Sequence, residues 1–340
     1  MASVLAFCFG CSSSDSARPR PLPDSVMTEL SSRSVRPETL GFQTDRVEDQ
    51  VVWQGPRTGY RVAGTVVSLP FSLEHGWPTI SARLNGTLNA AMVVDTGASL
   101  TSLDGRTAAS ARVRTVDTNH FPIQTLRGVG GTERTVLGLV DRLTLGGLDI
   151  TNMVVDVRLE ESPQGGGMFG RTPRLNNLLG LRPVMLGSSY VTIDYPQKKL
   201  TISPRAEFRP PLAGLGGRPV LEVPFAVVEQ TLRISLGFPN GRRAEFIVDT
   251  GYNGELLIST STTEYAGLDQ AVRSGRQGAV RGIGGEMMQI GFTIDWIEMG
   301  GRRFGYMKAL TGTRHDLIGS GWLRQFRVTF DFRRRVMWLE

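Results

Sequence analysis

Residues 93–99 read VVDTGAS, and the core of this stretch returns at residues 247–253 as IVDTGYN. Asp95 and Asp249 are each preceded by hydrophobic residues typical of a buried strand, and each is followed by Thr and Gly, which prolong such a strand poorly. We therefore expect the chain to turn directly after each aspartate. A carboxylate on a turn at the end of a buried strand is held rigidly, shielded on one side and open to a ligand on the other.

These two stretches belong to an internal repeat that covers most of the chain. Segments around both aspartates match at a constant offset of 154 residues, until the offset falls to 139 near the end of each copy. A register shared over a whole segment indicates duplication rather than chance. The first copy therefore carries about fifteen extra residues, which we expect in the Gly-rich segment 163–171. The matched segments are LPF at 69–71 with VPF at 223–225, RGVGG at 127–131 with RGIGG at 281–285, LLG at 178–180 with LIG at 317–319, and VTIDY at 191–195 with VTFDF at 328–332.

The repeat predicts two lobes, of residues 62–203 and 220–340. The connection at 204–219 is rich in proline and glycine and is not expected to form a core element. Within each lobe, short runs of strand-forming residues alternate with turn residues, and an Asn-Gly hairpin signal recurs at Asn85 and Asn240. Short helices are expected at 105–112 and 262–266.

The N-terminal region differs in composition from both lobes. Residues 1–11 form a short apolar stretch ending in Gly-Cys and resemble the end of a bacterial lipoprotein signal, in which Cys11 would be lipidated. This predicts a periplasmic or cell-envelope protein, anchored to the membrane where Cys11 carries the lipid, or a cytoplasmic one if the N-terminus is not a signal. Residues 12–61 lack sustained periodicity and are predicted to be a flexible tether, with 51–53 as a candidate edge strand.

Composition narrows the class of function. The net charge of +6 comes from scattered arginines that are not interleaved with aromatic residues, so nucleic-acid binding is not expected. The only cysteines, Cys8 and Cys11, lie outside the lobes, which therefore have no disulfide. The histidines, His75, His120 and His315, stand without metal-ligand spacing, so neither a metal nor another cofactor is expected.

The repeated motifs together resemble the retropepsin-like and pepsin-like aspartic protease superfamily. They are a hydrophobic pair before Asp-Thr-Gly, a Gly-rich hairpin about thirty residues on, a hydrophobic-hydrophobic-Gly strand and a closing V-T-h-D-h strand, where h is hydrophobic. The resemblance covers nearly all of residues 66–340, once per half. It implies an all-β, bilobal acid-protease barrel fold, with two retropepsin-like lobes on one chain related by a pseudo-two-fold axis.

Asp95 and Asp249 are the candidate catalytic residues of an aspartic endopeptidase. Two carboxylates that share one water cannot both ionise easily, so the pair holds one proton and can supply both a base and an acid. The titration belongs to the pair, so neither aspartate is assigned a fixed role.

The resemblance assigns supporting roles to the residues around this pair. Thr96 and Thr250 would donate hydroxyl hydrogen bonds to the backbone of the opposite lobe. Gly97 and Gly251 would allow close backbone approach. The flap tips would close over a peptide or protein substrate held as an extended strand, and the enzyme is expected to be a monomer. The predicted flap residues are Gly128, Val129, Gly130 and Gly131 in the first lobe and Gly282, Ile283, Gly284 and Gly285 in the second.

Two departures from the family pattern leave other functions open. Tyr252 follows the second Asp-Thr-Gly where Ala98 follows the first, and a tyrosine beside the dyad could narrow the site. A catalytically inactive peptide-binding or scaffolding protein using the same cleft is therefore the alternative, and a self-processing enzyme is a third hypothesis. No tyrosine lies between Asp95 and the first flap, which favours flaps of retropepsin character.

Overall fold

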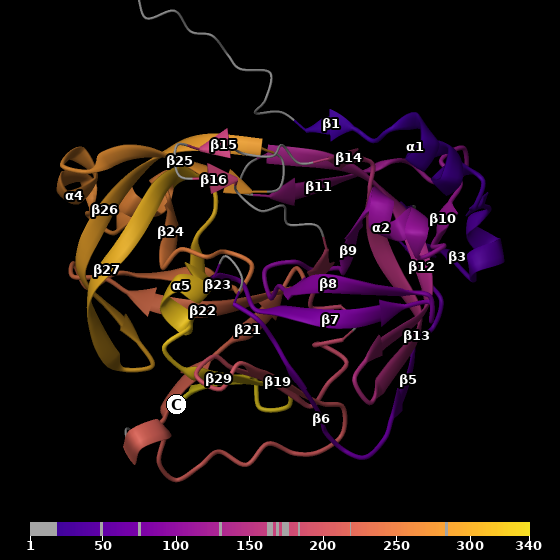
Figure 1. The fold of residues 1–340 in the computed structure, drawn as a ribbon. Coiled ribbons are helices and arrows are strands. Elements are labelled where there is room, and N and C mark those ends of the chain that lie inside the picture. The colour runs from indigo at the N-terminus through magenta and orange to yellow at the C-terminus, as the bar shows by residue number, and fades with distance from the viewer. Residues whose placement is uncertain are drawn as a thin grey trace, which may run out of the picture.

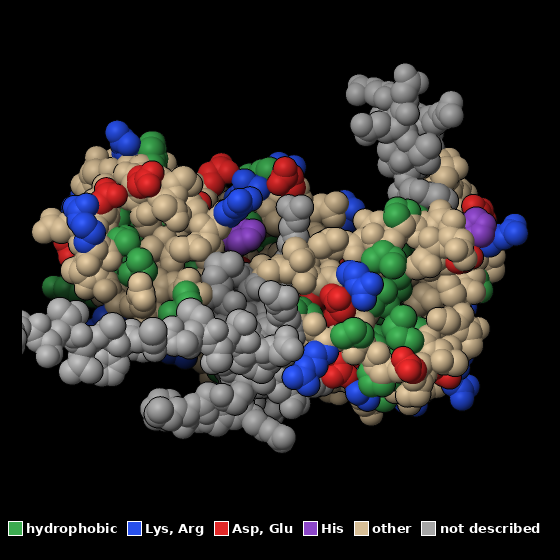
Figure 2. Space-filling view, turned by 90° about the horizontal axis from the view of Figure 1, so that it is seen from above, with side chains coloured by type: hydrophobic (Ala, Val, Ile, Leu, Met, Phe, Trp, Pro, Cys, Tyr) green, Lys and Arg blue, Asp and Glu red, His purple; other side chains and the backbone are tan. Residues whose placement is uncertain are grey.

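Two strand-rich lobes lie side by side in the computed structural model (Figure 1). Their strand order repeats, so the all-β bilobal fold predicted from the duplication is confirmed. Seen from above, acidic and basic side chains are intermingled over both lobes (Figure 2). The structure describes residues 19–47, 50–73, 76–128, 131–161, 166–167, 170–171, 177–182, 184–217, 219–282 and 285–340.

The first lobe is a sheet that closes on itself, because β12 pairs with both β7 and β13. Alternating buried apolar residues on these strands fill the barrel, as the period of a half-buried strand requires. Among the described residues the sheet has ten strands, β2 (Ser34–Val35), β10 (Arg114–Val116), β12 (Gly131–Leu145), β7 (Thr79–Leu84), β8 (Leu88–Val94), β17 (Leu178–Leu179), β9 (Ser102–Asp104), β13 (Leu148–Arg158) and β5 (Gly59–Val62), with β11 (Gln124–Gly128) paired to β12.

The second lobe repeats this circuit, closed by the pairing of β22 with β26. Its described strands are β21 (Ala226–Val228), β22 (Thr231–Gly237), β23 (Arg243–Asp249), β28 (Leu317–Gly319), β24 (Leu256–Ser259), β27 (Arg302–Thr313), β26 (Gly285–Met299) and β25 (Arg276–Gly282). The short helices of the two lobes are α2 (Gly105–Ser110), α3 (Thr260–Tyr265), α4 (Asp269–Arg273) and α5 (Ser320–Leu323).

A six-stranded sheet below the two barrels is shared between the lobes (Figure 1). At its centre β18 and β29 pair antiparallel, which sets Thr192 opposite Thr329 with their hydroxyl oxygens 2.8 Å apart. Arg327 Nε donates to Asp194 Oδ2 across the same junction at 2.8 Å. In order the strands are β20 (Leu221–Pro224), β30 (Val336–Leu339), β29 (Arg327–Asp331), β18 (Tyr190–Asp194), β19 (Lys199–Ser203) and β6 (Val67–Pro70).

The prediction of a flexible tether over residues 12–61 is wrong where the structure describes them. Leu22 and Leu30 are 5% and 3% exposed in the main hydrophobic core, and β2 pairs in parallel with β10 of the first lobe. A few leucines in short elements anchor this segment to the core. Because its hydrophobic residues do not recur with the period of a long helix or strand, the sequence gives no sign of this packing. The elements are β1 (Arg20–Pro21), α1 (Asp24–Ser31), η2 (Pro37–Leu40) and the hairpin of β3 (Gln43–Val47) with β4 (Gln50–Gln54), so residues 51–53 pair with β3 rather than with a lobe edge.

Residues absent from the second copy lie between β13 and β17. Their described parts are β14 (Glu160–Glu161), β15 (Gly166–Gly167) and β16 (Gly170–Arg171), and β14 pairs with β1 of the N-terminal segment. Between the lobes, the described residues of 204–219 contain only η4 (Leu215–Gly217). Within the described parts of the chain, no helix has the length and apolar character needed to cross a membrane.

Candidate active site

Each Asp-Thr-Gly loop leaves the end of a buried strand beside a short parallel strand. Leu178 of β17 is registered with Val93 of β8, and Leu317 of β28 with Ile247 of β23. These equivalent pairings place Asp95 and Asp249 at the same point of each lobe. Residues that match at the sequence offset therefore occupy equivalent positions in the two lobes.

Backbone donors fix one oxygen of each carboxyl group. Asp95 Oδ1 accepts hydrogen bonds from Gly97 N at 2.8 Å and Ala98 N at 3.1 Å. Asp249 Oδ1 accepts from Gly251 N at 2.8 Å and Tyr252 N at 3.0 Å. The two carboxyl groups also hydrogen-bond to each other, so one solvent molecule could contact both.

Reciprocal threonine bonds join the two loops across the lobe interface. Thr96 Oγ1 donates to the Val248 carbonyl and Thr250 Oγ1 donates to the Val94 carbonyl, each at 2.6 Å. Each hydroxyl also accepts from the opposite threonine's backbone N–H, at 3.0 and 3.1 Å. Both threonines are fully buried, so these four bonds hold the aspartate loops in fixed positions.

Burial and mutual repulsion keep a proton on the pair. Loss of solvent raises the pKa of the Asp95 carboxyl, although its hydrogen bond from Asp249 and the backbone donors oppose the shift. The pKa of the Asp249 carboxyl is raised well above its ordinary value by burial, then by the charge and hydrogen bond of Asp95. Such a pair retains one shared proton at a pH where two isolated carboxyls would both be ionised.

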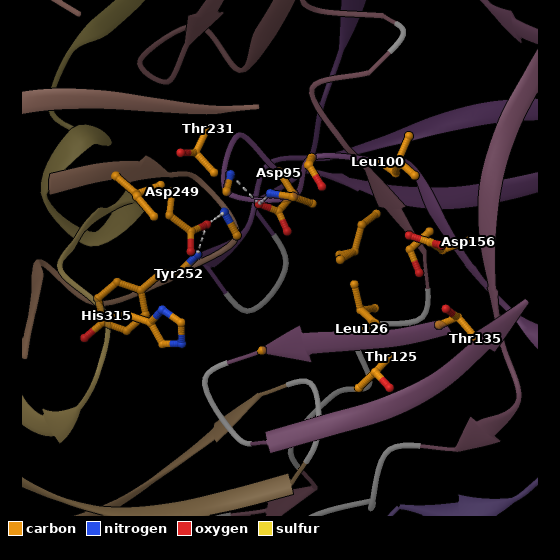
Figure 3. A pocket seen from close by; sticks show the side chains of 18 of the residues that line it. Asp95, Leu100, Thr125, Leu126, Thr135, Asp156, Thr231, Asp249, Tyr252 and His315 are labelled. Carbon is orange, nitrogen blue, oxygen red and sulfur yellow. Dashed lines mark hydrogen bonds between the residues drawn. The ribbon is translucent and has the colours of Figure 1, made fainter. Parts of the chain in front are cut away.

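The carboxyl pair lies in a cleft of about 580 Å³ between the lobes (Figure 3). Gly128 and neighbouring residues of the β11–β12 hairpin line the cleft from the first lobe. Strand β12 lies against β26, so the two hairpins meet across the lobe boundary. Gly128 pairs with Gly131, and Gly282 with Gly285, at the ends of the hairpins. The predicted flap tips Val129, Gly130, Ile283 and Gly284 lie outside the described residues, as do Cys8, Cys11 and His75.

Tyr252 lies at the side of the cleft rather than across the dyad. Its ring packs with Leu257 and Leu317, and its hydroxyl donates to the Leu256 carbonyl at 3.3 Å. On the other side of the dyad, Trp77 packs with Val93 and Leu178. Each lobe therefore has one aromatic residue beside its aspartate loop, supplied from different positions of the repeat.

Sequence reasoning missed the residues that only one lobe carries. Trp77 Nε1 donates to the Gly251 carbonyl at 2.8 Å and so ties the first lobe to the second aspartate loop. Its counterpart at the offset of 154 is Thr231, which also lines the cleft. Asp156 lines the cleft as well, although its counterpart is Leu310. A search for matching residues cannot find such positions; a search for mismatches between the copies could have.

Among the described residues, no group of three or more His, Cys, Asp or Glu side chains is placed to hold a metal ion. The site as described is thus a pair of carboxyl groups, their backbone donors and an interlobe cleft. Such a pair can exchange protons with a water molecule and a polarised carbonyl.

The closed barrels, shared sheet and paired Asp-Thr-Gly loops define a bilobal aspartic protease of retropepsin type. The sequence profile of the family described as "Aspartyl protease" matches residues 80–181 and 231–320, which is more than half of the chain, with one match in each lobe. The protein belongs to this family.

A solved structure is also similar, that of a retropepsin-like aspartic protease from Rickettsia conorii. The two are 19% identical, with a TM-score of 0.29, and the match covers 35% of this chain and 90% of that one. No curated protein matches the sequence.

Proposed function

We propose that the protein is an aspartic endopeptidase in which Asp95 and Asp249 together activate a water molecule against a peptide bond. The observation that carries this proposal is the contact between two carboxyl groups, that of Asp95 buried and that of Asp249 half-buried, within an interlobe cleft. Their positions are fixed by four backbone N–H donors, two to each carboxyl. Little rearrangement is then needed when charge develops during the reaction.

The chemistry follows from the single proton that the pair retains. The ionised member removes a proton from water, whose oxygen adds to the peptide carbonyl carbon. The protonated member donates to the carbonyl oxygen, which gives a neutral tetrahedral diol. When the C–N bond breaks, the departing nitrogen takes a proton from the protonated member, and a diol hydroxyl gives its proton to the ionised member. The products are a carboxylic acid and an amine, and the pair again holds one shared proton.

The proposed substrate is a peptide or protein segment in an extended conformation. The β11–β12 hairpin lines the cleft from the first lobe and meets β26 of the second. An extended peptide beside such a hairpin can form backbone hydrogen bonds, while alternate side chains enter pockets on either side.

The test is cleavage of a diverse peptide library followed by mass spectrometry. Asp95→Asn and Asp249→Asn keep the size of each side chain and its acceptor oxygen but remove the ionisable pair. We expect each to lower kcat/KM at least about 1,000-fold, because the acid and the base act as a unit. Asp149→Asn, on β13 but outside the cleft, should cleave like the wild type.

Cleavage at wild-type rate by both dyad variants would refute the assignment. Circular dichroism should show that all three variants are folded. Tight binding of peptides without turnover, from mildly acidic to neutral pH, would instead favour the peptide-binding alternative.

A further inference from the structure

A polar recess opens from the first-lobe side of the cleft. Its walls include Leu100, Thr135 and Asp156, and Leu126 of the β11–β12 hairpin lies beside it (Figure 3). Ser102 lines the same cleft. Ser102 and Thr135 are each only 1% exposed. Neither hydroxyl oxygen has a hydrogen-bond partner among the described residues. Two buried polar atoms that line a cavity without partners suggest that a ligand supplies them.

The Asp156 carboxyl group faces the same recess. Burial raises the pKa of this carboxyl to about 6, with no opposing contribution from a nearby cation. Among the described residues that line the cleft, none is a lysine or an arginine. An ionised carboxylate in such a place is unfavourable until a cation or a strong donor reaches it.

The second lobe shows what fills the equivalent space there. At the offset of 154, Ala98 corresponds to Tyr252 and Leu100 to Gly254. A Cβ atom on Gly254 would lie 2.2 Å from the Tyr252 hydroxyl oxygen, so the tyrosine occupies the space that a side chain at this position would need.

The Tyr252 hydroxyl donates a hydrogen bond to the carbonyl of Leu256. Leu256 is the counterpart of Ser102 at the offset of 154. The second lobe therefore fills its own recess with a long side chain that ends in a hydrogen-bond donor. In the first lobe Ala98 is too short to do so, and Asp156 replaces the counterpart Leu310.

We propose that this recess binds a lysine or arginine side chain of the peptide substrate, with Asp156 as its ion-pair partner and the Ser102 and Thr135 hydroxyls as further hydrogen-bond acceptors. The proposal rests on the proposed function and adds a preference for basic residues at one position of the substrate. Leu100 and Leu126 would pack against the methylene groups of the bound side chain, which long cationic side chains allow.

The experiment uses matched peptides that differ at one residue. In a peptide cleaved by the wild type, each position flanking the scissile bond is replaced in turn by lysine, norleucine or glutamate. We expect kcat/KM for lysine to exceed that for norleucine by about 10- to 100-fold at one position, because a desolvated charge pair discriminates strongly. Glutamate at that position should be cleaved least.

Substitutions in the protein then assign the preference. Asp156→Asn should reduce the lysine-to-norleucine ratio to about threefold or less by slowing cleavage of the lysine peptide alone. Asp156→Leu, which copies the residue of the second lobe, should reverse the preference toward norleucine. Asp149→Asn makes the same change on the same strand outside the cleft, and should keep the wild-type ratio.

An unchanged lysine-to-norleucine ratio in Asp156→Asn would overturn the proposal, as would a wild-type preference for norleucine at every position. If the wild type cleaves no peptide, the proposed endopeptidase activity is refuted, but the proposal that the recess binds a basic side chain is not. The recess is then tested by fluorescence anisotropy with labelled library peptides and full-length Asp249→Asn protein. Equal affinity for lysine and norleucine peptides in that assay would also overturn it.

Discussion

Gly97 and Gly251 each lie against the aspartate of the opposite lobe, which leaves room only for glycine at these positions. A Cβ atom at Gly97 would lie 2.4 Å from Cγ of Asp249, and one at Gly251 would lie 2.5 Å from Cγ of Asp95. The two loops therefore approach so closely that neither position has room for a methyl group. Because each glycine contacts the carboxyl group of the other lobe, it controls the spacing of the dyad.

Gly97→Ala is accordingly expected to lower kcat/KM at least about 100-fold while the protein stays folded, because a small displacement of a catalytic group is sufficient for such a loss. Peptide cleavage and thermal melting measure the two effects. Gly147→Ala is the control, since its Cβ would meet nothing closer than 3.9 Å. Activity of Gly97→Ala within threefold of the wild type would show that the spacing is not critical.

Asp156 is also expected to reduce the stability of the folded protein. Its carboxyl pKa rises from an ordinary 3.8 to about 6, so the folded state binds this proton more tightly than the unfolded state does. The stabilising contribution of the protonated form is complete below about pH 4 and is lost as pH rises through about 6.

Asn does not titrate, so Asp156→Asn should gain stability over the wild type between these pH values. The gain should reach about 1 to 3 kcal/mol at pH 7.5, since one unit of pKa shift corresponds to about 1.4 kcal/mol. Urea unfolding at pH 4.5 and pH 7.5 gives the difference at each pH. A difference that does not grow with pH would contradict the burial of an unpaired carboxylate.

Among the elements, α1 is part of the first lobe rather than of a tether. Leu30 is 3% exposed and belongs to the main core, whereas Thr28 on the same helix faces solvent. Leu30→Ala should therefore lower the free energy of unfolding by about 2 to 5 kcal/mol, as for other buried leucines. Thr28→Ala should change it by less than about 0.5 kcal/mol. Equal small effects in urea unfolding would mean that α1 is not docked in solution.

The same elements show what the sequence could and could not predict. Strands that recur at a fixed offset were predictable, because a duplicated register marks β8 with β23 and β17 with β28. The docking of α1 was not predictable, because an eight-residue helix with one fully buried leucine has no clear period. The recess was missed for another reason, since Asp156 and Ala98 differ from their counterparts in the second lobe.

On the scale of the whole molecule, the shared sheet and the aspartate loops both join the lobes. The shared sheet sets β18 of one lobe beside β29 of the other, and the threonine bonds join the aspartate loops above it. Neither lobe can complete the sheet alone, because without β29 of the second lobe β18 would become an unpaired edge strand. We infer that the lobes unfold together, in one transition.

Thr250→Val tests this coupling at its most buried point. Valine has the shape of threonine, but the substitution leaves the Thr96 N–H without its acceptor, and the Val94 carbonyl without its donor. Each unsatisfied buried group costs roughly 1 to 3 kcal/mol, so we expect a loss of about 2 to 5 kcal/mol for the whole protein. Thr201→Val, whose exposed hydroxyl meets Ser68 at 3.0 Å in the shared sheet, should lose less than about 1 kcal/mol.

Differential scanning calorimetry should show one peak for both variants and for the wild type, with equal calorimetric and van't Hoff enthalpies. The whole peak of Thr250→Val should shift to lower temperature, because the two hydrogen bonds that the substitution removes stabilise both lobes at once. Two separated peaks, of which only one moved, would mean that the lobes are independent folding units. The dyad spacing would then depend on how two separately stable lobes dock, rather than on a single cooperative fold.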